Sequence, residues 1–484
     1  MVCLQPGYLS RFDRVAKPEV PRAKVGIGID FGTSNSVAAL YDGEGLELVD
    51  LGPAGAIIPS ATYIDKSFGA SVGQEAIDRY ILANTGRTVE LIPEVIGESF
   101  EFSGATGGEN IEPVDTVGTK IYGAAVVDSG LDGRLFRGTK RLLGDSKVHR
   151  LMVFDQPFRL VALITPLLLH IRKRIQESLP GANYGHLGHP VNFEGRDEHR
   201  NKLGISRLAD AFKFAGIIDQ TFYPEPIAAA VSYLEENPKV EGDIVLSFDF
   251  GGGTLDLCIL RRIDASFEVV STHGVAIGGD HIDQKIFRSL LFPMLGEGAR
   301  WRRPGMDKEI DTLFPFGDYA DLLVNWPISY TLNQNRYTAP ITDFIKQGDE
   351  EVDKLERLRD LIQQNLSYVV FQEIKDFKAR LSYSDSAVLD IPEIDVKVSF
   401  TRLEFENLIG DFLAKIQEAL DHILNQSNLD LQDIDLVLRT GGSSLIPAVE
   451  RILEHRFPGR VVEHNPFTSV AAGLAIADFK SILS

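Results

Sequence analysis

Two short stretches of this chain repeat the same order of residue types, and this repeat constrains the fold more than any other feature. The first, "IGIDFGTSNSVAAL" from Ile27 to Leu40, has an apolar run that ends near Asp30, then Gly and hydroxyl residues, then a second apolar run. The second, "DIVLSFDFGGGTLDLCIL" from Asp243 to Leu260, has Asp249 at the matching place. Alternating apolar residues on both sides of a short turn predict a β-hairpin. Two such hairpins predict a duplicated fold, whose two lobes each present an Asp-Gly-Thr turn to a common cleft.

The rest of the chain alternates between strand and helix patterns, which predicts the α/β class. A third glycine pair lies in "IDLVLRTGGSSLIPAVERIL", between a strand predicted for Ile434 to Leu438 and a helix with Pro447 in its first turn. Pro226 in "EPIAAAVSYLEE" marks another helix start. Residues 349–382 are charged, helical in pattern and free of Gly and Pro.

We predict that the chain divides into a flexible leader, lobe I, lobe II and a segment that returns to lobe I. In this order, the four parts are residues 1–24, 25–240, 241–460 and 461–484. The glycine-rich stretch near 86–133 is weakly periodic, and we interpret it as an insertion or small subdomain of lobe I. A helical subdomain of lobe II is predicted near 285–385.

Composition limits the partners and the compartment. The 484 residues carry a formal net charge of -20, and an acidic surface repels nucleic acids and anionic membranes. Cys3 and Cys258 are too few for a disulfide framework, and the leader has no apolar core typical of a signal peptide, so we expect the cytoplasm. The most apolar stretch, Leu160 to Leu169, contains Pro166 and is shorter than the roughly 20 residues that span a membrane. A buried helix is predicted there.

The two turns have the chemistry of a metal and phosphate site. Glycine lets the backbone approach a phosphate closely, and successive N–H groups in a turn bind anions. Thr33, Ser34 and Thr254 add hydroxyl donors. Asp30 and Asp249 repel each other if they face one another, unless a cation lies between them. Mg²⁺, held through waters and phosphate oxygens, suits this arrangement. Each turn is therefore predicted to supply half of a clamp for a metal–phosphate ligand.

Other motifs fit less well. The chain has no Gly-x-x-x-x-Gly-Lys-Ser/Thr, which excludes a P-loop, and Phe31 stands where the Rossmann pattern needs its last glycine. Asp249 opens an Asp-Phe-Gly triplet as in kinases, but no His-Arg-Asp loop accompanies it. "GASVG", from Gly69 to Gly73, fits the nucleophile elbow of serine hydrolases, a short and degenerate pattern.

Together the three glycine loops resemble the phosphate-one, phosphate-two and adenosine motifs of the actin, heat-shock-70 and sugar-kinase superfamily. The details are most similar to DnaK-type chaperones. "IDFGTSNS" resembles their first phosphate loop, "LFRGTKRLLGD" their lysine segment, "YPEPIAAAVSY" their glutamate-proline helix, and "VVSTHGVAIGGDHID" the strand and double glycine after phosphate-two. The resemblance runs in order from Val25 to Ser484. It implies an α/β, duplicated actin-like (ribonuclease-H-like) ATPase fold with two lobes around a nucleotide cleft.

Three further motifs resemble the short YegD-like branch of this family: "HPVNFEG" from His189 to Gly195, "FPMLGEG" and "NWPISYTLNQ". A full DnaK-type chaperone continues through an apolar linker into a peptide-binding domain and a lid. This sequence stops shortly after the nucleotide domain, so we expect a protein without a peptide-binding domain.

The resemblance implies a role for each matching residue. Lys140, Glu225, Asp249 and Thr254 match catalytic residues. Lys140 is expected beside the terminal phosphate, and Glu225 is expected to orient the metal or the attacking water. The carboxylates matched around Mg²⁺ are Asp30, Asp249 and Asp256. The implied nucleotide-binding residues are Gly32, Thr33, Ser34, Gly251, Gly252, Gly253, Gly278, Gly279, Lys378, Ser382, Gly441, Gly442 and Ser443.

Several residues depart from the family pattern. Leu445 and Ala379 stand where the family has arginines, and Phe467 takes the place of an aspartate. Losing a guanidinium stack on the base removes on the order of 1 kcal/mol, and Phe467 is an alternative stacking ring. Pro190 matches a proline that switches between nucleotide states. The resemblance implies a partner arginine after Pro190, but Arg196 and Arg200 both miss its spacing.

We therefore predict a slow, Mg²⁺-dependent ATPase of the heat-shock-70 type that binds ATP or ADP, with K⁺ as an optional second cation. Its lobes are expected to open and close with the nucleotide, and a client or co-chaperone protein to respond. Neither a nucleic acid nor a membrane is an expected partner. Two alternatives stay open. A nucleotide-gated scaffold or actin-like filament subunit predicts ATP-dependent sedimentation, and a small-molecule kinase predicts phosphate transfer to a metabolite instead of water.

Overall fold

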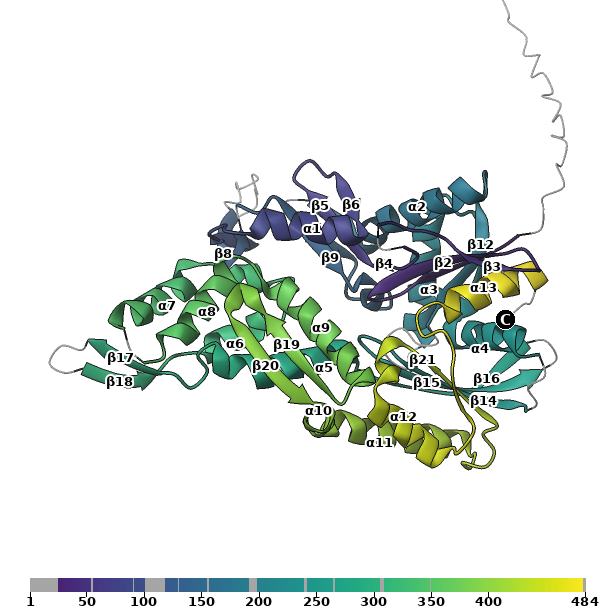
Figure 1. Ribbon diagram of the computed structural model, residues 1–484. Helices are drawn as coiled ribbons and strands as arrows, with labels where there is room; N and C mark the ends of the chain where they lie inside the picture. The colour runs from purple at the N-terminus through teal and green to yellow at the C-terminus, as the bar shows by residue number, and fades with distance from the viewer. Residues whose placement is uncertain are drawn as a thin grey trace, which may run out of the picture.

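Two lobes, each built on its own sheet, make up the body of the protein (Figure 1). The computed structural model describes residues 25–53, 55–89, 91–100, 118–128, 130–154, 156–190, 198–238, 242–263, 266–304, 309–348 and 350–481. The predicted leader, Cys3 and Arg196 lie outside these ranges.

Lobe I contains a sheet in the order β13-β12-β1-β2-β3, with β4 paired to β2. Its strands are β1 (Gly26–Phe31), β2 (Asn35–Tyr41), β3 (Leu46–Leu48), β4 (Ile58–Pro59), β12 (Tyr184–His189) and β13 (Asp219–Pro224). β1 and β2 form the antiparallel hairpin predicted around Asp30, and β12 lies parallel to β1. The hairpin therefore carries its turn at the same sheet edge as the end of β12.

Lobe II repeats this arrangement in the order β16-β15-β14-β21-β22. Its strands are β14 (Ile244–Phe250), β15 (Leu255–Ile263), β16 (Ser266–Val275), β21 (Leu436–Thr440) and β22 (Val461–Glu463). β14 and β15 form the second predicted hairpin, and β21 lies parallel to β14, as β12 does to β1. The duplication that the sequence predicts is thus present in strand direction and in turn position.

Two helices rich in small residues pack between the sheets of the two lobes, α4 (Glu225–Glu236) and α13 (Ser469–Lys480). They approach so closely that a Cβ on Gly473 would lie 1.7 Å from the carbonyl oxygen of Ala228. Likewise, a Cβ on Gly28 of β1 would lie 2.1 Å from the carbonyl oxygen of Ala471. Glycine is required at both positions because backbone meets backbone there. Through α13, the end of the chain returns to the sheet of lobe I.

The other helices cover the outer faces and build the subdomains. In lobe I they are α1 (Gly73–Asn84), α2 (Leu160–Ser178) and α3 (Glu198–Phe214). In lobe II they are α5 (Gly279–Ile286), α6 (Gly317–Leu323), α7 (Asn335–Gln347), α8 (Val352–Gln363), α9 (Ser367–Tyr383), α10 (Arg402–Leu408), α11 (Gly410–Ser427) and α12 (Pro447–Arg456). The apolar stretch with Pro166 begins α2, whose inner face is buried, as predicted. Among the described residues, no helix combines the length and apolar composition needed to cross a membrane.

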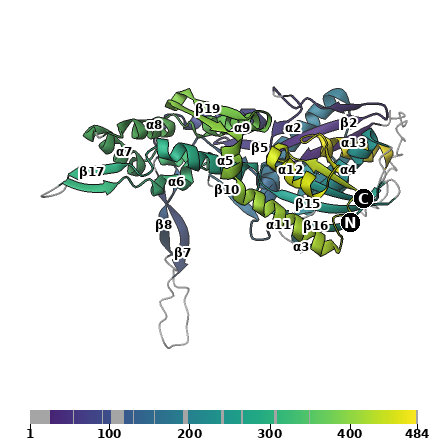
Figure 2. The same cartoon turned by 60° about the horizontal axis from the view of Figure 1, so that its bottom comes forward.

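Small strand pairs complete both lobes. Lobe I has a sheet of β5 (Ala61–Asp65), β6 (Ala70–Val72) and β9 (Gly133–Arg137), and a hairpin of β10 (Arg150–Val153) and β11 (Gln156–Arg159). Lobe II has the pairs β17 (Arg300–Pro304) with β18 (Glu309–Leu313) and β19 (Ser386–Ile391) with β20 (Val396–Thr401). Within the stretch 86–133, β7 (Leu91–Phe100) and β8 (Gly118–Asp128) form a hairpin that projects from the body (Figure 2). Its connection, residues 101–117, lies outside the described residues.

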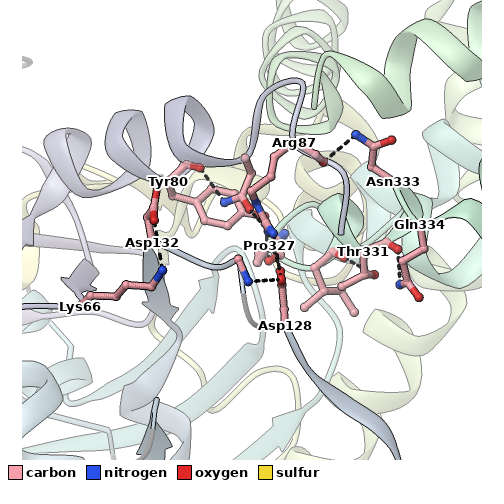
Figure 3. Close-up of polar contacts among 12 residues, drawn as sticks. Lys66, Tyr80, Arg87, Asp128, Asp132, Pro327, Thr331, Asn333 and Gln334 are labelled. Atoms are coloured by element: carbon pink, nitrogen blue, oxygen red, sulfur yellow. Dashed lines mark hydrogen bonds and ion pairs between the residues drawn. The ribbon is translucent and has the colours of Figure 1, made fainter. Parts of the chain in front are cut away.

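Beyond the two central sheets, the lobes also meet where α1 and the loop after it contact the helical subdomain of lobe II (Figure 3). The Tyr80 hydroxyl donates to the carbonyl of Pro327 at 2.9 Å, and the Asn333 side-chain amide donates to the carbonyl of Arg87 at 2.7 Å. The Arg87 guanidinium forms an ion pair with Asp128 at 2.6 Å. The two hydrogen bonds join lobe I to lobe II at a second place, and the ion pair, which lies within lobe I, holds the Arg87 side chain there.

Candidate functional site

The two Asp-Gly turns lie against each other between the lobes. Asp30 stands near the end of β1 and Asp249 near the end of β14. A Cβ on Gly252 of the second turn would lie 3.1 Å from Oγ of Ser34 in the first turn. The second turn is closed by the Gly251 N–H, which donates to the carbonyl of Thr254 at 3.0 Å. The structure thus brings together the turns that the repeat predicted to face each other.

A buried ion pair lies beside these turns. Lys140 belongs to a short 3₁₀ segment, Thr139–Leu142, that follows Gly138 at φ 64°. Its ammonium lies 2.6 Å from the carboxylate of Glu225, the first residue of α4, and the two side chains are 6% and 19% exposed. Burial by itself would lower the pKa of Lys140, but the charges of Glu225 and Asp30 outweigh it, and the pKa is raised. Lys140 is therefore held as a cation inside the cleft.

Three aspartates lie near this ion pair. Burial raises the pKa of Asp30 to about 7; Glu225 adds to the shift and Lys140 opposes it. Burial, followed by the charge of Asp256, raises the pKa of Asp249 to about 7. Burial also raises the pKa of Asp256 to about 6, although its hydrogen bond from the Thr254 hydroxyl, 2.7 Å long, favours the charged form. The cluster carries more negative than positive charge, an arrangement that a bound cation would relieve.

The donor set fits a hydrated Mg²⁺ better than a fully protein-bound metal. Among the residues in the described ranges, no three His, Cys, Asp or Glu side chains are grouped so that they could hold a metal ion by themselves. Mg²⁺ usually keeps several waters and binds through one or two carboxylates and the phosphates of a substrate. Asp30, Asp249 and Asp256 can accept hydrogen bonds from such waters. The residues therefore fit Mg²⁺ brought in with a phosphate ligand.

The predicted glycine pair at the start of α5 packs on the second turn. The Gly279 N–H donates to the carbonyl of Gly251 at 3.0 Å, and the Ser443 hydroxyl donates to the same oxygen at 2.9 Å. A Cβ on Gly278 would lie 2.4 Å from the carbonyl oxygen of Gly252. Two segments far apart in sequence, the start of α5 and the loop at Ser443, therefore converge on one turn of the cleft.

Two other predicted nucleotide residues, both on α9, have protein partners. The Lys378 ammonium lies 2.5 Å from the carboxylate of Asp283, which is 1% exposed, and also donates to the carbonyl of Gly279 at 3.1 Å. The Ser382 hydroxyl donates to the carbonyl of Lys378 at 3.3 Å. Lys378 thus lies at the cleft with its charge already paired, while Ser382 is turned onto its own helix.

The third glycine loop touches the acidic cluster directly. Gly441 has φ 78°, and a Cβ there would lie 2.4 Å from Oδ1 of Asp249. A Cβ on Gly442 would lie 2.7 Å from the ring of Phe467, a side chain that is 51% exposed. Leu445 ends the short helix that follows, Gly442–Leu445, and Ala379 lies on α9.

Sequence reasoning missed Arg141, the neighbour of Lys140. A Cβ on Gly253 would lie 1.4 Å from Nη2 of Arg141, so the guanidinium covers the face of the second turn. The signal was present in "GTKRLLGD", where only the lysine was given a role. Pro190, the predicted switch residue, directly precedes residues 191–197, which lie outside the described ranges. Arg200 follows this gap in the sequence, and its guanidinium lies 3.8 Å from the carboxylate of Asp145.

A duplicated hairpin-and-parallel-strand core, with a buried lysine and acidic side chains between its two turns, defines an actin-like nucleotide-binding fold. The Hsp70 protein family model matches residues 203–293 and 349–479. A chaperone protein dnaK of Cyanidioschyzon merolae is 25% identical over 464 residues, which cover 94% of this chain and 61% of that protein. The chain is therefore similar to Hsp70-family proteins, and it spans about 61% of the length of this relative.

Proposed function

We propose that this protein binds ATP with Mg²⁺ and hydrolyses it slowly, and that its lobes move with the nucleotide state as in a chaperone-like switch. The observation that carries the proposal is the buried Lys140–Glu225 pair, 2.6 Å long, surrounded by aspartates between two glycine turns. A permanent cation beside the backbone N–H groups of two glycine turns suits a phosphate chain. Carboxylates at the same place suit a metal and a water.

Each group has a task in phosphoryl transfer to water. Lys140 would neutralise charge on the terminal phosphate, and the N–H groups of the two turns would hold its oxygens. Glu225, which fixes Lys140, would also accept a hydrogen bond from the attacking water. When bound, Mg²⁺ would neutralise charge on the phosphate oxygens. Thr254 keeps Asp256 oriented through its 2.7 Å hydrogen bond.

The relation between the lobes supports a switch. The catalytic residues come from both lobes, because Asp30 and Lys140 belong to lobe I, and Asp249 and Asp256 to lobe II. Loss of the terminal phosphate would remove what both turns hold, so the lobes would separate more easily. The proposal includes a client or co-chaperone protein that binds differently to the two states of the lobes. The expected compartment is the cytoplasm.

The test is release of γ-phosphate from ATP with Mg²⁺, together with calorimetric nucleotide binding, for the wild type, Lys140→Ala and the control Lys147→Ala. Lys147 is an exposed lysine of the same loop region. We expect turnover to fall by roughly 10² or more in Lys140→Ala and to be unchanged in the control. Phosphate release that is equal in all three proteins would overturn the catalytic assignment. ATP binding without release would favour a nucleotide-held scaffold, and transfer to an added metabolite would favour a kinase.

A further inference from the structure

A groove on the outer surface of lobe I lies apart from the nucleotide cleft. It has a volume of about 740 Å³ and is formed by β6, the start of α1, α2 and the end of α3. Pro166, Leu169 and Phe214 contribute apolar walls. Leu169 is 48% exposed and Phe214 is 66% exposed. Large apolar side chains that line a concave surface and remain exposed are typical of a site that another molecule covers.

Basic side chains flank this groove. A smaller groove of about 330 Å³ adjoins it and shares Arg159 and Phe214 with it. Arg159 and Arg150 lie directly opposite each other in the β10–β11 hairpin, and both are exposed. Like charges at opposed positions of a hairpin are destabilising unless a counter-charge is near. Lys173 of α2 adds a further exposed positive charge to the wall of the larger groove.

These charges are not neutralised within the part of the protein that the structure describes. No ion pair of Arg150, Arg159 or Lys173 is present there. The acidic residue of the larger groove, Glu75, already pairs with Arg79 at 2.9 Å. The acidic residue that lines the smaller groove is Asp210, a single negative charge against several positive ones. A local excess of positive charge on a chain of net charge -20 marks a surface for a negatively charged partner.

We propose that this groove binds an acidic segment of a partner protein, one in which carboxylates alternate with apolar side chains. The apolar side chains would cover Leu169 and Phe214, and the carboxylates would pair with Arg150, Arg159 and Lys173. An extended nucleic acid or an anionic membrane fits less well, because the net charge of -20 on the whole chain repels a large polyanion. The chain's own leader, residues 1–24, is rich in Arg and Lys and has the wrong charge.

The experiment is a selection of displayed random peptides on the wild-type protein without nucleotide. Enriched peptides are synthesised and titrated against the wild type, Arg159→Glu and Phe214→Ser. The matched control is Lys213→Glu, which reverses an exposed charge next to Phe214 that does not line either groove. ATP turnover of each variant is measured in parallel, because the groove lies outside the nucleotide site and turnover should stay unchanged.

We expect acidic sequences with interspersed leucine or aromatic residues to be enriched. Their affinity should fall about tenfold or more in Arg159→Glu and in Phe214→Ser, should fall with added salt, and should be unchanged in the control. Enrichment of basic sequences, no enrichment, or equal affinity for all four proteins would overturn the proposal. Self-association of the wild type that Phe214→Ser abolishes would also overturn it, by assigning the groove to a second copy. Peptide binding at the groove is measured without nucleotide. A negative result there therefore leaves the proposed ATPase untouched, and a protein without ATP turnover leaves the groove proposal untouched.

Discussion

Lys140 and Glu225, which are 85 residues apart in the sequence, form a 2.6 Å ion pair at the centre of the cleft. The pair joins the segment after β9 to the first residue of α4 and places one positive charge among several carboxylates. Because both side chains are largely buried, neither charge can be solvated if its partner is removed.

Removing only one partner of this pair should therefore destabilise the fold. We expect Lys140→Met to lower the free energy of unfolding by about 3 kcal/mol, because Glu225 and Asp30 would lose their counter-charge. The double variant Lys140→Met, Glu225→Gln should recover part of this loss. Urea denaturation of the two single variants and the double variant measures the coupling, and strictly additive effects would contradict it.

Gly441 should tolerate no side chain. Its φ of 78° disfavours every other residue, and the Cβ of Gly441→Ala would meet Asp249 at 2.4 Å and the Phe250 backbone at 2.5 Å. We expect a loss of about 3 kcal/mol or more in stability. Gly459→Ala is the control, because Gly459 has a similar φ of 69° with no atom within 4 Å of the Cβ. It should cost about 1 kcal/mol, and equal losses in both variants would show that backbone strain alone decides.

The Arg87–Asp128 pair supports the second contact between the lobes. The side chain of Asp128 is 4% exposed, so Arg87→Met should leave an unpaired buried carboxylate and cost about 3 kcal/mol. Adding Asp128→Asn removes that charge and should restore part of the stability. Thermal unfolding of both variants tests this expectation. A double variant less stable than Arg87→Met would contradict it.

His464 should make the protein lose stability in mild acid. It is 4% exposed, and its Nε2 lies 2.9 Å from the hydroxyl of Ser232. Burial lowers its pKa from 6.5, with Glu236 opposing the shift. A lowered pKa means that the unfolded chain takes up the proton first. The contribution of His464 is therefore complete above pH 6.5 and is lost as the pH falls through the lowered pKa of the folded state.

The measurement compares unfolding free energies of the wild type and His464→Gln between pH 7.5 and 5 by urea denaturation. The difference between the two pH slopes isolates His464 from the aspartates of the cleft, whose raised pKa values act in the opposite direction. We expect the variant to show a shallower loss below pH 6.5. Parallel curves would contradict the assignment.

The sequence was sufficient for the repeated parts of the fold. The alternation around Asp30 and Asp249 predicts two hairpins, and both form with their turns in contact. The helix through Pro166 also follows from local pattern. For Lys378, the resemblance implies a nucleotide contact, which stays a prediction, and the structure adds an ion pair with Asp283, 95 residues earlier in the chain. No local pattern predicts that partner, because only the packing of α9 on α5 brings the two charges together.

What the sequence by itself determined is local: which segments alternate, where glycine permits a tight turn, and which residue types stand at each turn. These properties depend on neighbours within a few positions, and so they can be read directly. The tertiary structure alone decided which charges share a buried space. Lys140 becomes a paired cation, Arg141 covers Gly253, and Arg159 meets Phe214 at one groove, because packing joins distant segments and removes water from between them.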